Sequence, residues 1–394
     1  YPKPASYIRA LRPVLGGGLL ISEGRIWREN RRLAAPLFRP SRMPRYYDRM
    51  GGWIAAERDA WHNAAAADRR VDLQESMTRI ALNIICAAMF GIDASDRIPV
   101  ISACMEQIQA DLGRFRISSM LPLPKWLPLV PDRATRAAIR ELDSVVTAVI
   151  AGRRTESAAP RHDFLEVLMQ ASDPESGRRF TDRQLRDEIM TILLAGHETS
   201  ATALTWTFVL LARHPEVQEA FAAEARAAFG GSAPDYHALQ AFTGARNLFK
   251  EALRLYPPGY NFTRVALKDD VLGGCRIPAG SIVNVTPYLI HRNPVHWPDP
   301  LRFRPDRFAA AGDLKTRYFP FGGGPRVCIG NSFAAQEAEL ILATLCQAFR
   351  VEGVEGPLTS SPAITLRPAF DTRARIVARV ADAKAALGSP FTMA

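Results

Sequence analysis

Lysine is scarce in this chain: only six of the 50 basic residues are lysine, and the others are arginine. The formal net charge is +10, but the basic residues are dispersed along the chain and no nucleic-acid-binding motif accompanies them. We therefore expect no nucleic acid partner. An acidic protein partner is the better explanation of the excess positive charge.

Cysteines and long apolar runs are also few. The chain has five cysteines, an odd number, and no CxxC pair, which argues against a disulfide scaffold or a four-cysteine zinc site and favours a reducing, cytoplasmic compartment. No uninterrupted apolar run reaches the roughly 18 residues that cross a bilayer, so a membrane span is not indicated. The opening stretch YPKPASYIRA does not have the pattern of a signal peptide.

The apolar content, 47% over 394 residues, is enough for a large core. Because no linker divides the sequence, we interpret residues 1–394 as one domain. The first two-thirds has helical periodicity, most clearly over residues 71–91, 132–154 and 245–256. The longest helix begins near Thr181, whose spacing from Gln184 is that of a capping box, and runs to about residue 215.

The pattern of apolar residues changes after this helical part. Short alternating runs with glycine turns over residues 263–293, and again after residue 350, predict a few strands and hairpins. The sequence therefore predicts a mainly α fold with a small β region. A proline-broken apolar loop over residues 118–131 is either a lid over a pocket or a plain packed connection.

The stretch FGGGPRVCIG, residues 321–330, places Cys328 directly before a helix-favouring run. A thiolate at a helix N-terminus is stabilised by free backbone N–H groups and the helix dipole. The planar guanidinium of Arg326 suits a carboxylate, and Phe321 can shield the sulfur. The glycines, including Gly330, let the backbone pass close to a flat group. A thiolate-bound haem iron with propionates fits this pattern. A structural cysteine in a glycine-rich turn is the alternative.

The full string F-G-x-G-x-R-x-C-x-G resembles the haem-binding signature of the cytochrome P-450 family. The resemblance implies a P-450 fold with a long central helix across haem b, Cys328 as the proximal iron ligand, and Arg326 on a haem propionate. It also implies a monooxygenase that uses O2. The family's N-terminal strands and first helices precede the part that this sequence matches.

A second family pattern, LLAGHETS, lies inside the longest predicted helix. Ala195, Gly196 and Thr199 share a helix face by their spacing. Glycine is unfavourable in a helix interior, and room for dioxygen is one reason for it here. The resemblance implies that Thr199 donates a hydrogen bond to dioxygen and that Glu198 relays protons from solvent. An ordinary bend in a buried helix is the alternative. His197 and His214 are expected to face solvent.

Three further matches are architectural or contact the haem. KEALR gives Glu251 and Arg254 at a spacing of three, and PDRF adds Arg307 as the third member of a buried triad, with Asp306 in place of the family's glutamate. On a predicted helix, Trp27 and Arg31 lie one turn apart and can face one propionate.

The histidine that often follows Trp27 in the family is replaced by Asn30, so that propionate contact is in doubt. Arg264 and His291 match positions that often meet the other propionate and the haem edge. The alternatives are an ordinary strand arginine and a turn histidine whose hydrogen bonds are satisfied.

The resemblance also implies partners. Electrons must come from a separate acidic ferredoxin or flavodoxin, for which Arg28, Arg32, Lys315 and Arg317 are candidate docking residues. The substrate is expected to be a hydrophobic small molecule. Its pocket would be lined by the following residues: 14–22, Leu194, Ala195, 258–262 and Phe370. A peroxide-using haem-thiolate enzyme and a non-catalytic haem-binding sensor are alternative functions.

Overall fold

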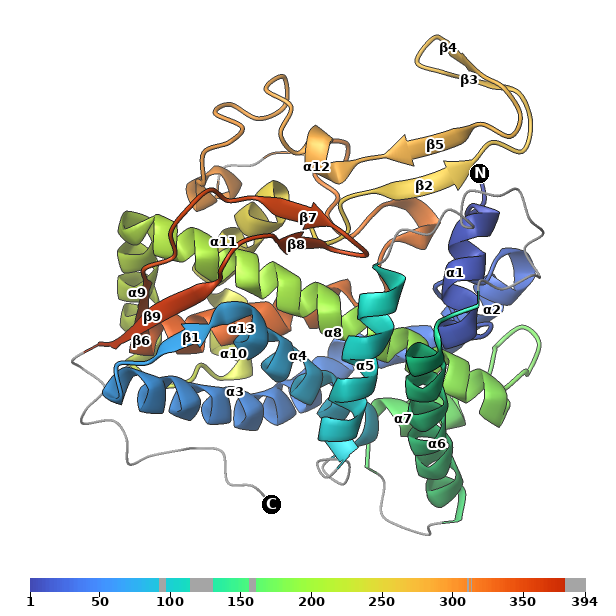
Figure 1. Cartoon of the computed structure of the whole chain (residues 1–394), viewed down its shortest axis with the longest axis horizontal. Coiled ribbons are helices and arrows are strands. Elements are labelled where there is room, and N and C mark those ends of the chain that lie inside the picture. The colour runs from blue at the N-terminus through green and yellow to red at the C-terminus, as the bar shows by residue number, and fades with distance from the viewer. Residues whose placement is uncertain (92–96, 114–129, 156–160, 310–311, 313, 380–394) are drawn as a thin grey trace. The chain divides into compact units, whose positions relative to one another are not determined.

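The computed structural model describes residues 1–91, 97–113, 130–155, 161–309, 312 and 314–379 (Figure 1). The chain divides into two compact units, each of which is built from three separate stretches of sequence. The first consists of residues 1–39, 85–195 and 261–286, and the second of residues 40–84, 196–260 and 287 onward. The proline-broken loop that we interpreted as a lid or a connection lies mostly outside the described residues.

The first unit is mainly helical. Its helices are α1 (Ala5–Leu15), α2 (Gly24–Ala34), the 3-10 turn η1 (Ala35–Phe38), α5 (Ile98–Leu112), α6 (Arg133–Thr155) and α7 (Phe164–Gln170). Helix α6 buries Ala138, Leu142, Val146 and Ile150 at spacings of four, and α5 packs against it. Its strands form two hairpins that continue into one another as a single arm (Figure 1): β2 (Phe262–Val265), β3 (Asp270–Leu272), β4 (Cys275–Ile277) and β5 (Ile282–Val285).

The long helix is α8 (Asp182–Arg213), with 32 residues. The predicted capping box is present: the Gln184 N–H donates to the Thr181 hydroxyl at 3.3 Å, and the Thr181 N–H donates to the Gln184 side chain at 3.1 Å. The first part of α8, through Ala195, belongs to the first unit, and the remainder, from Gly196, belongs to the second.

The second unit contains the other elements. Its helices and 3-10 turns are η2 (Pro40–Arg42), α3 (Met43–Ala66), α9 (Pro215–Phe229), α10 (Tyr236–Ala241), α11 (Thr243–Leu255), α12 (Pro287–Ile290), η5 (Pro305–Phe308), η6 (Gly324–Arg326) and α13 (Asn331–Ala348). Helix α4 (Leu73–Phe90) belongs partly to each unit and is followed by Gly91, whose φ of 77° is typical of a glycine that ends a helix. Helix α13 is buried along most of its length and packs on α3, α9 and α11.

Two small antiparallel sheets complete the second unit. In one, β9 (Arg373–Ala378) lies between β1 (Arg70–Asp72) and β6 (Phe349–Glu352), with Arg70 opposite Arg375. In the other, β7 (Ser360–Pro362) pairs with β8 (Leu366–Pro368). The predicted mainly α fold with a late β region is thus confirmed. Among the helices that the structure describes, none is long and apolar enough to cross a membrane.

Candidate haem site

The cysteine loop, residues 321–330, is a tight turn closed by its own backbone. The Cys328 N–H donates to the Phe321 carbonyl at 2.9 Å. Gly322 and Gly324 have φ angles of 76° and 64°, in the left-handed region where a side chain introduces strain. The glycines at these two positions are therefore required by the turn, which carries Cys328 to the start of α13.

The five thiols differ in their surroundings. Burial raises the pKa of Cys86 and of Cys346 to about 12, and it also raises the pKa of Cys104. The two exposed thiols are Cys275, on the β3–β4 hairpin, and Cys328. Of these two, Cys328 is the one that lies close before a helix, two residues ahead of Gly330, the N-cap of α13, where backbone N–H groups stabilise a thiolate.

The loop around Cys328 fits a haem. Its thiol is exposed, and a Cβ added to Gly323 or to Gly324 would meet no atom within 4 Å, so a flat group can approach the backbone there. Arg326, in η6, lies two residues before the cysteine and supplies a cation for a carboxylate. The loop therefore offers a thiol, an open backbone face and a guanidinium, which are the groups that a haem with propionates needs.

The middle of α8 has one accessible face. The residues that we assigned to the oxygen-binding face are exposed or half-buried: Ala195, Gly196 and Thr199. Their immediate neighbours are buried: His197, Glu198 and Ser200. The 3.6-residue period places the predicted set on one side, and the accessible side coincides with it.

Buried Glu198 is held by the β7–β8 hairpin, which the sequence motifs did not reveal. Its Oε1 accepts hydrogen bonds from the Thr365 hydroxyl at 2.7 Å and from Arg367 Nε at 2.8 Å, and Arg367 Nη2 lies 2.6 Å away. His197 is also buried, so the prediction that it faces solvent is wrong. Burial lowers the pKa of His197 to about 4, which leaves the imidazole neutral. His214 is half-buried at the start of α9 and lies 3.4 Å from Glu216.

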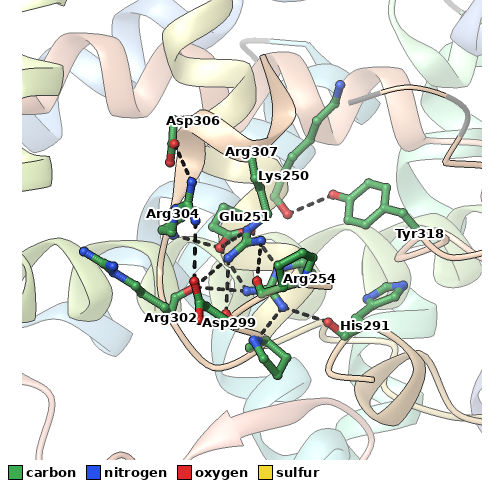
Figure 2. A network of polar contacts seen from close by, with 12 residues as sticks. Lys250, Glu251, Arg254, His291, Asp299, Arg302, Arg304, Asp306, Arg307 and Tyr318 are labelled. Atoms are coloured by element: carbon green, nitrogen blue, oxygen red, sulfur yellow. Dashed lines mark hydrogen bonds and ion pairs between the residues drawn. The ribbon is translucent and has the colours of Figure 1, made fainter. Parts of the chain in front are cut away.

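The predicted triad is present as a buried network (Figure 2). Arg254 binds both carboxylate oxygens of Glu251, at 2.7 and 2.9 Å, and Arg307 Nε donates to the same carboxylate at 3.0 Å. Asp306 is joined to this network only through half-buried Arg304, whose side chain donates to the Asp306 carboxylate at 3.0 Å and whose backbone N–H donates to Glu251 at 2.8 Å. The network fixes the segment that precedes the cysteine loop.

His291 is fully buried next to this network. Its backbone carbonyl accepts from Arg254, and its Nε2 accepts the Phe319 N–H at 3.0 Å. Burial, with the nearby Arg254 cation, lowers the pKa of His291 to about 3, so the ring is neutral. These two bonds agree with the turn histidine that we named as the alternative, but Nδ1 of the ring is buried without a hydrogen-bond partner among the described residues, so its hydrogen bonds are satisfied only in part. A contact between His291 and the haem stays a prediction.

The remaining predicted haem contacts lie in the first unit. Trp27 and Arg31 occupy α2 at a spacing of four, and both are half-buried. Arg264, on β2, donates to the Thr263 carbonyl at 2.9 Å. Asn30, in doubt as a propionate contact, is buried and donates to Glu188 of α8 at 2.8 Å.

Asn30 therefore ties α2 to α8. Burial raises the pKa of its partner Glu188 to about 7. The glycine stretch GGG, residues 16–18, contacts the same part of α8, where the Gly17 N–H donates to Asp187 at 2.7 Å.

Helix α13 carries a buried carboxyl group, that of Glu337, which sequence reasoning missed. The Ser200 hydroxyl donates to Glu337 Oε2 at 2.7 Å, and the other oxygen of Glu337 is buried without a hydrogen-bond partner among the described residues. Burial raises the pKa of Glu337 to about 8, so the group keeps its proton at neutral pH.

We expect Glu337→Gln to stabilise the protein above neutral pH. The unfolded chain releases the Glu337 proton near the ordinary pKa of 4.5, whereas the folded chain holds it to about 8, so the free energy of unfolding falls as pH rises through this window. Glutamine stays neutral and escapes this loss, which we expect to be on the order of 2 kcal/mol or more at pH 8 and to vanish near pH 4. Denaturant unfolding across this pH range measures it. The control is Glu355→Gln, at an exposed position; a stability difference that does not change with pH would contradict the expectation.

Comparison with known proteins agrees with this site. The cytochrome P450 family model matches residues 1–369. The chain belongs to the cytochrome P450 family. Relatives include cyclooctatin synthase of Streptomyces melanosporofaciens, which is 35% identical over 88% of this chain and 75% of the relative. Cyclooctat-9-en-7-ol 5-monooxygenase of the same species and pentalenene oxygenase of Streptomyces avermitilis are each 31% identical, over 88% of this chain and 75% and 76% of the relatives.

Solved P450 structures are similar as well. The heme domain of cytochrome P450DA, in a mutant form, superposes with a TM-score of 0.83 at 28% identity, covering 94% of this chain and 82% of the other. The chain is thus a P450 monooxygenase, an oxidoreductase that acts on hydrophobic substrates and uses O2 and a redox partner. The cofactor of a P450 is a haem ligated by a cysteine thiolate, and the loop around Cys328 fits this cofactor.

Proposed function

We propose that this P450 inserts one oxygen atom of O2 into a hydrophobic small molecule, with Cys328 as the thiolate ligand of haem b. The observation that carries the proposal is the exposed Cys328 thiol at the start of α13, two residues after Arg326. The overall reaction consumes substrate, O2, two electrons and two protons and yields the hydroxylated product and water. We also propose that residues 1–394 form a single haem domain.

We propose a terpenoid-like substrate, an unsaturated hydrocarbon or its alcohol. The names of two relatives support it, because they specify oxygenation of pentalenene and of cyclooctat-9-en-7-ol. The segment from Pro258 to Phe262, which we assign to the pocket, is mainly apolar, and the hydroxyl of Tyr260 within it donates to the Ala363 carbonyl at 3.1 Å. Ala363 lies between β7 and β8, so the β7–β8 hairpin fixes this segment of the proposed pocket.

We assign the haem contacts to the residues that the family resemblance implies. Trp27, Arg31, Arg264 and Arg326 would hold propionates, with His291 at the haem edge, and Phe321 and Gly330 would lie beside the sulfur. The haem, when bound, supplies the oxygen activation and the oxidation of the substrate. The chain's own contribution is to exclude water, orient the substrate and deliver protons.

Proton delivery is assigned to α8. Gly196 and Ala195 have no bulky side chains, so the accessible face leaves room for dioxygen next to Thr199. The Thr199 hydroxyl donates a hydrogen bond to the reacting oxygen and passes on a proton that Glu198 takes from solvent. These roles rest on the accessible position of Thr199 and the buried position of its neighbour Glu198.

We propose an acidic ferredoxin or flavodoxin as the electron donor. Arg28 and Lys315 are exposed and remain candidates for docking. Arg32 is not available in the way we expected, since its Nε bonds Asp173 at 2.6 Å and its Nη2 lies 3.1 Å from Glu175. Arg317 is half-buried, with its guanidinium 5.9 Å from the centre of the Trp297 ring. Docking is therefore better assigned to Arg28 than to Arg32.

We expect Thr199→Ala to uncouple electron consumption from product formation. Without the hydroxyl, protons reach the wrong oxygen or arrive late, so electrons are lost to hydrogen peroxide, and product per electron falls by roughly tenfold or more. The measurement compares electron consumption, product and peroxide with a reconstituted donor. Thr199→Ser is the matched control and keeps its coupling.

Turnover driven by hydrogen peroxide distinguishes the proposed monooxygenase from the alternative, a peroxide-using haem-thiolate enzyme. Peroxide already carries the two protons and two electrons that O2 requires, so Thr199→Ala leaves that rate largely unchanged if Thr199 delivers protons. Efficient peroxide turnover by the wild type, with none from O2 and an electron donor, would instead identify a peroxide-using enzyme.

A further inference from the structure

The glycine loop, residues 16–19, packs directly against α8 within the first unit. A Cβ added to Gly18 would lie 2.1 Å from the Thr191 hydroxyl oxygen and 2.6 Å from the Asp187 carbonyl oxygen, closer than real Cβ atoms approach. A Cβ added to Gly16 would lie 2.1 Å from the Asp187 carboxylate. The loop backbone therefore touches the helix at two positions that leave no room for a side chain.

Hydrogen bonds hold the same backbone in place. Three consecutive side chains of α8 each bind one backbone group in or next to the loop: Arg186 the Val14 carbonyl at 2.8 Å, Asp187 the Gly17 N–H at 2.7 Å and Glu188 the Leu19 N–H at 3.1 Å. Arg186 also binds Asp143 of α6 at 2.7 Å and Asp187 at 3.0 Å. Two of the three side chains are thus held by an ion pair.

Glu188 is held by an amide instead. Its Oε1 accepts from Asn30 Nδ2 of α2 at 2.8 Å, while its Oε2 accepts the Leu19 N–H. The two side chains are buried, Asn30 with 2% and Glu188 with 1% of its surface exposed. Asn30 Oδ1 is buried without a hydrogen-bond partner among the described residues, so the amide is oriented by its NH2 group. That group fixes the carboxylate that holds Leu19.

We propose that Asn30 is a positioning residue that sets, through Glu188, how far the glycine loop can leave α8 and how large a ligand the pocket admits. The inference rests on the proposed function, in which residues 14–22 line the substrate pocket. Without the Asn30 donor, Glu188 can turn away from the Leu19 N–H, and an open form of the loop becomes more populated. A ligand too large for the closed form binds the open one, so its affinity rises by the same factor.

The first test measures hydrogen exchange at the Leu19 amide in Asn30→Leu, which removes the donor and fills the space. We expect exchange about tenfold faster than in wild type, the effect of weakening one hydrogen bond. Mass spectrometry of the holoenzyme at pH 8 measures it, since Glu188, with a pKa of about 7, is then mostly ionised. Arg25→Leu is the matched control on α2, because the Arg25 side chain is 85% exposed. Unchanged exchange in Asn30→Leu overturns the proposal.

The second test compares two ligands of the haem iron, imidazole and the much bulkier clotrimazole, through the shift of the Soret band. In Asn30→Leu we expect clotrimazole to bind about tenfold more tightly and imidazole to bind as in wild type, because the small ligand fits the closed form. Faster exchange with unchanged clotrimazole affinity would show that the loop does not limit ligand size, and would overturn the proposal. If neither ligand shifts the band of the wild type, the haem site of the proposed function fails, and the inference falls with it.

A double-mutant cycle decides whether Asn30 acts through Glu188. Glu188→Leu should itself speed exchange at Leu19, and adding Asn30→Leu should then cause no further increase, since both changes release the same N–H. If the two effects multiply, Asn30 acts by another route and the proposal is wrong.

A glycine substitution moves the loop without altering Asn30 or Glu188. Gly18→Ala drives a methyl group into the Thr191 hydroxyl and the Asp187 carbonyl, so we expect faster Leu19 exchange and tighter clotrimazole binding. Gly17→Ala is the control for exchange, because a Cβ there would lie 3.6 Å from the Asp187 carboxylate, an ordinary contact. Faster exchange in Gly18→Ala without a gain in clotrimazole affinity would again refute the proposal.

Discussion

Cys328→Ser abolishes the strongly red-shifted Soret band that we expect the wild-type ferrous protein to show with carbon monoxide. The band reports electron donation from a thiolate to the iron, and a serine hydroxyl at the same position is a far weaker donor. Monooxygenase turnover should fall below detection together with the band. Absorption spectra of the reduced, carbon monoxide-bound protein measure the effect directly.

The matched control is Cys275→Ser, which changes the other exposed thiol. Cys275 lies on β4 within a hairpin and does not precede a helix, so its variant should keep the wild-type spectrum. Buried Cys86 and Cys346 make poorer controls because replacing them disturbs the core. If the red-shifted band survives in Cys328→Ser, or is lost in Cys275→Ser, Cys328 is not the thiolate ligand of the iron.

Arg254→Met is expected to have the second largest effect, a loss of about 3–5 kcal/mol in the free energy of unfolding. The guanidinium, fully buried, binds the Glu251 carboxylate and also donates to the carbonyls of His291, Pro300 and Arg302 at 2.7, 2.7 and 3.2 Å (Figure 2). Without the guanidinium, the buried Glu251 carboxylate loses one of its two arginine partners, and three backbone carbonyls lose a hydrogen-bond donor. Denaturant unfolding, with haem content followed in parallel, measures the loss.

An arginine of the neighbouring segment provides the control. Arg304 pairs with Asp306 through a side chain that is 36% exposed, so Arg304→Met should change stability by about 1 kcal/mol or less. Similar losses in the two variants would mean that the buried network is not the source of the stability. A retained carbon monoxide spectrum in folded Arg254→Met would confirm that the residue acts on architecture and not on ligation.

The parts of the site that the sequence could predict are those encoded by short spacings. Glu251 and Arg254 are three residues apart on one helix, and the cysteine loop is a continuous string, so a pattern of residue types was sufficient to identify them. The accessible face of α8 follows from the helical period. Each of these features depends on neighbours within a turn or a few turns of chain.

The features that escaped prediction depend on distant partners. Arg367 meets Glu198 across 169 residues, and Ser200 meets Glu337 across 137, and no local spacing records such pairs. Arg32 has the sequence surroundings of an exposed arginine, yet Asp173 binds it from 141 residues away. His197 was misplaced because a polar residue type suggested solvent, whereas its position on α8 is buried.

The three-stranded sheet imposes an order on biosynthesis. Strand β9 is central, and among the strands that the structure describes it is the one with which β1, near residue 70, pairs. A nascent chain therefore carries β1 without its hydrogen-bonding neighbour until almost all of the described sequence has been translated. Non-local pairing of this kind slows folding and leaves strand edges open to misassembly in the meantime. Chaperone occupancy during translation should accordingly persist until Arg373–Ala378 leaves the ribosome.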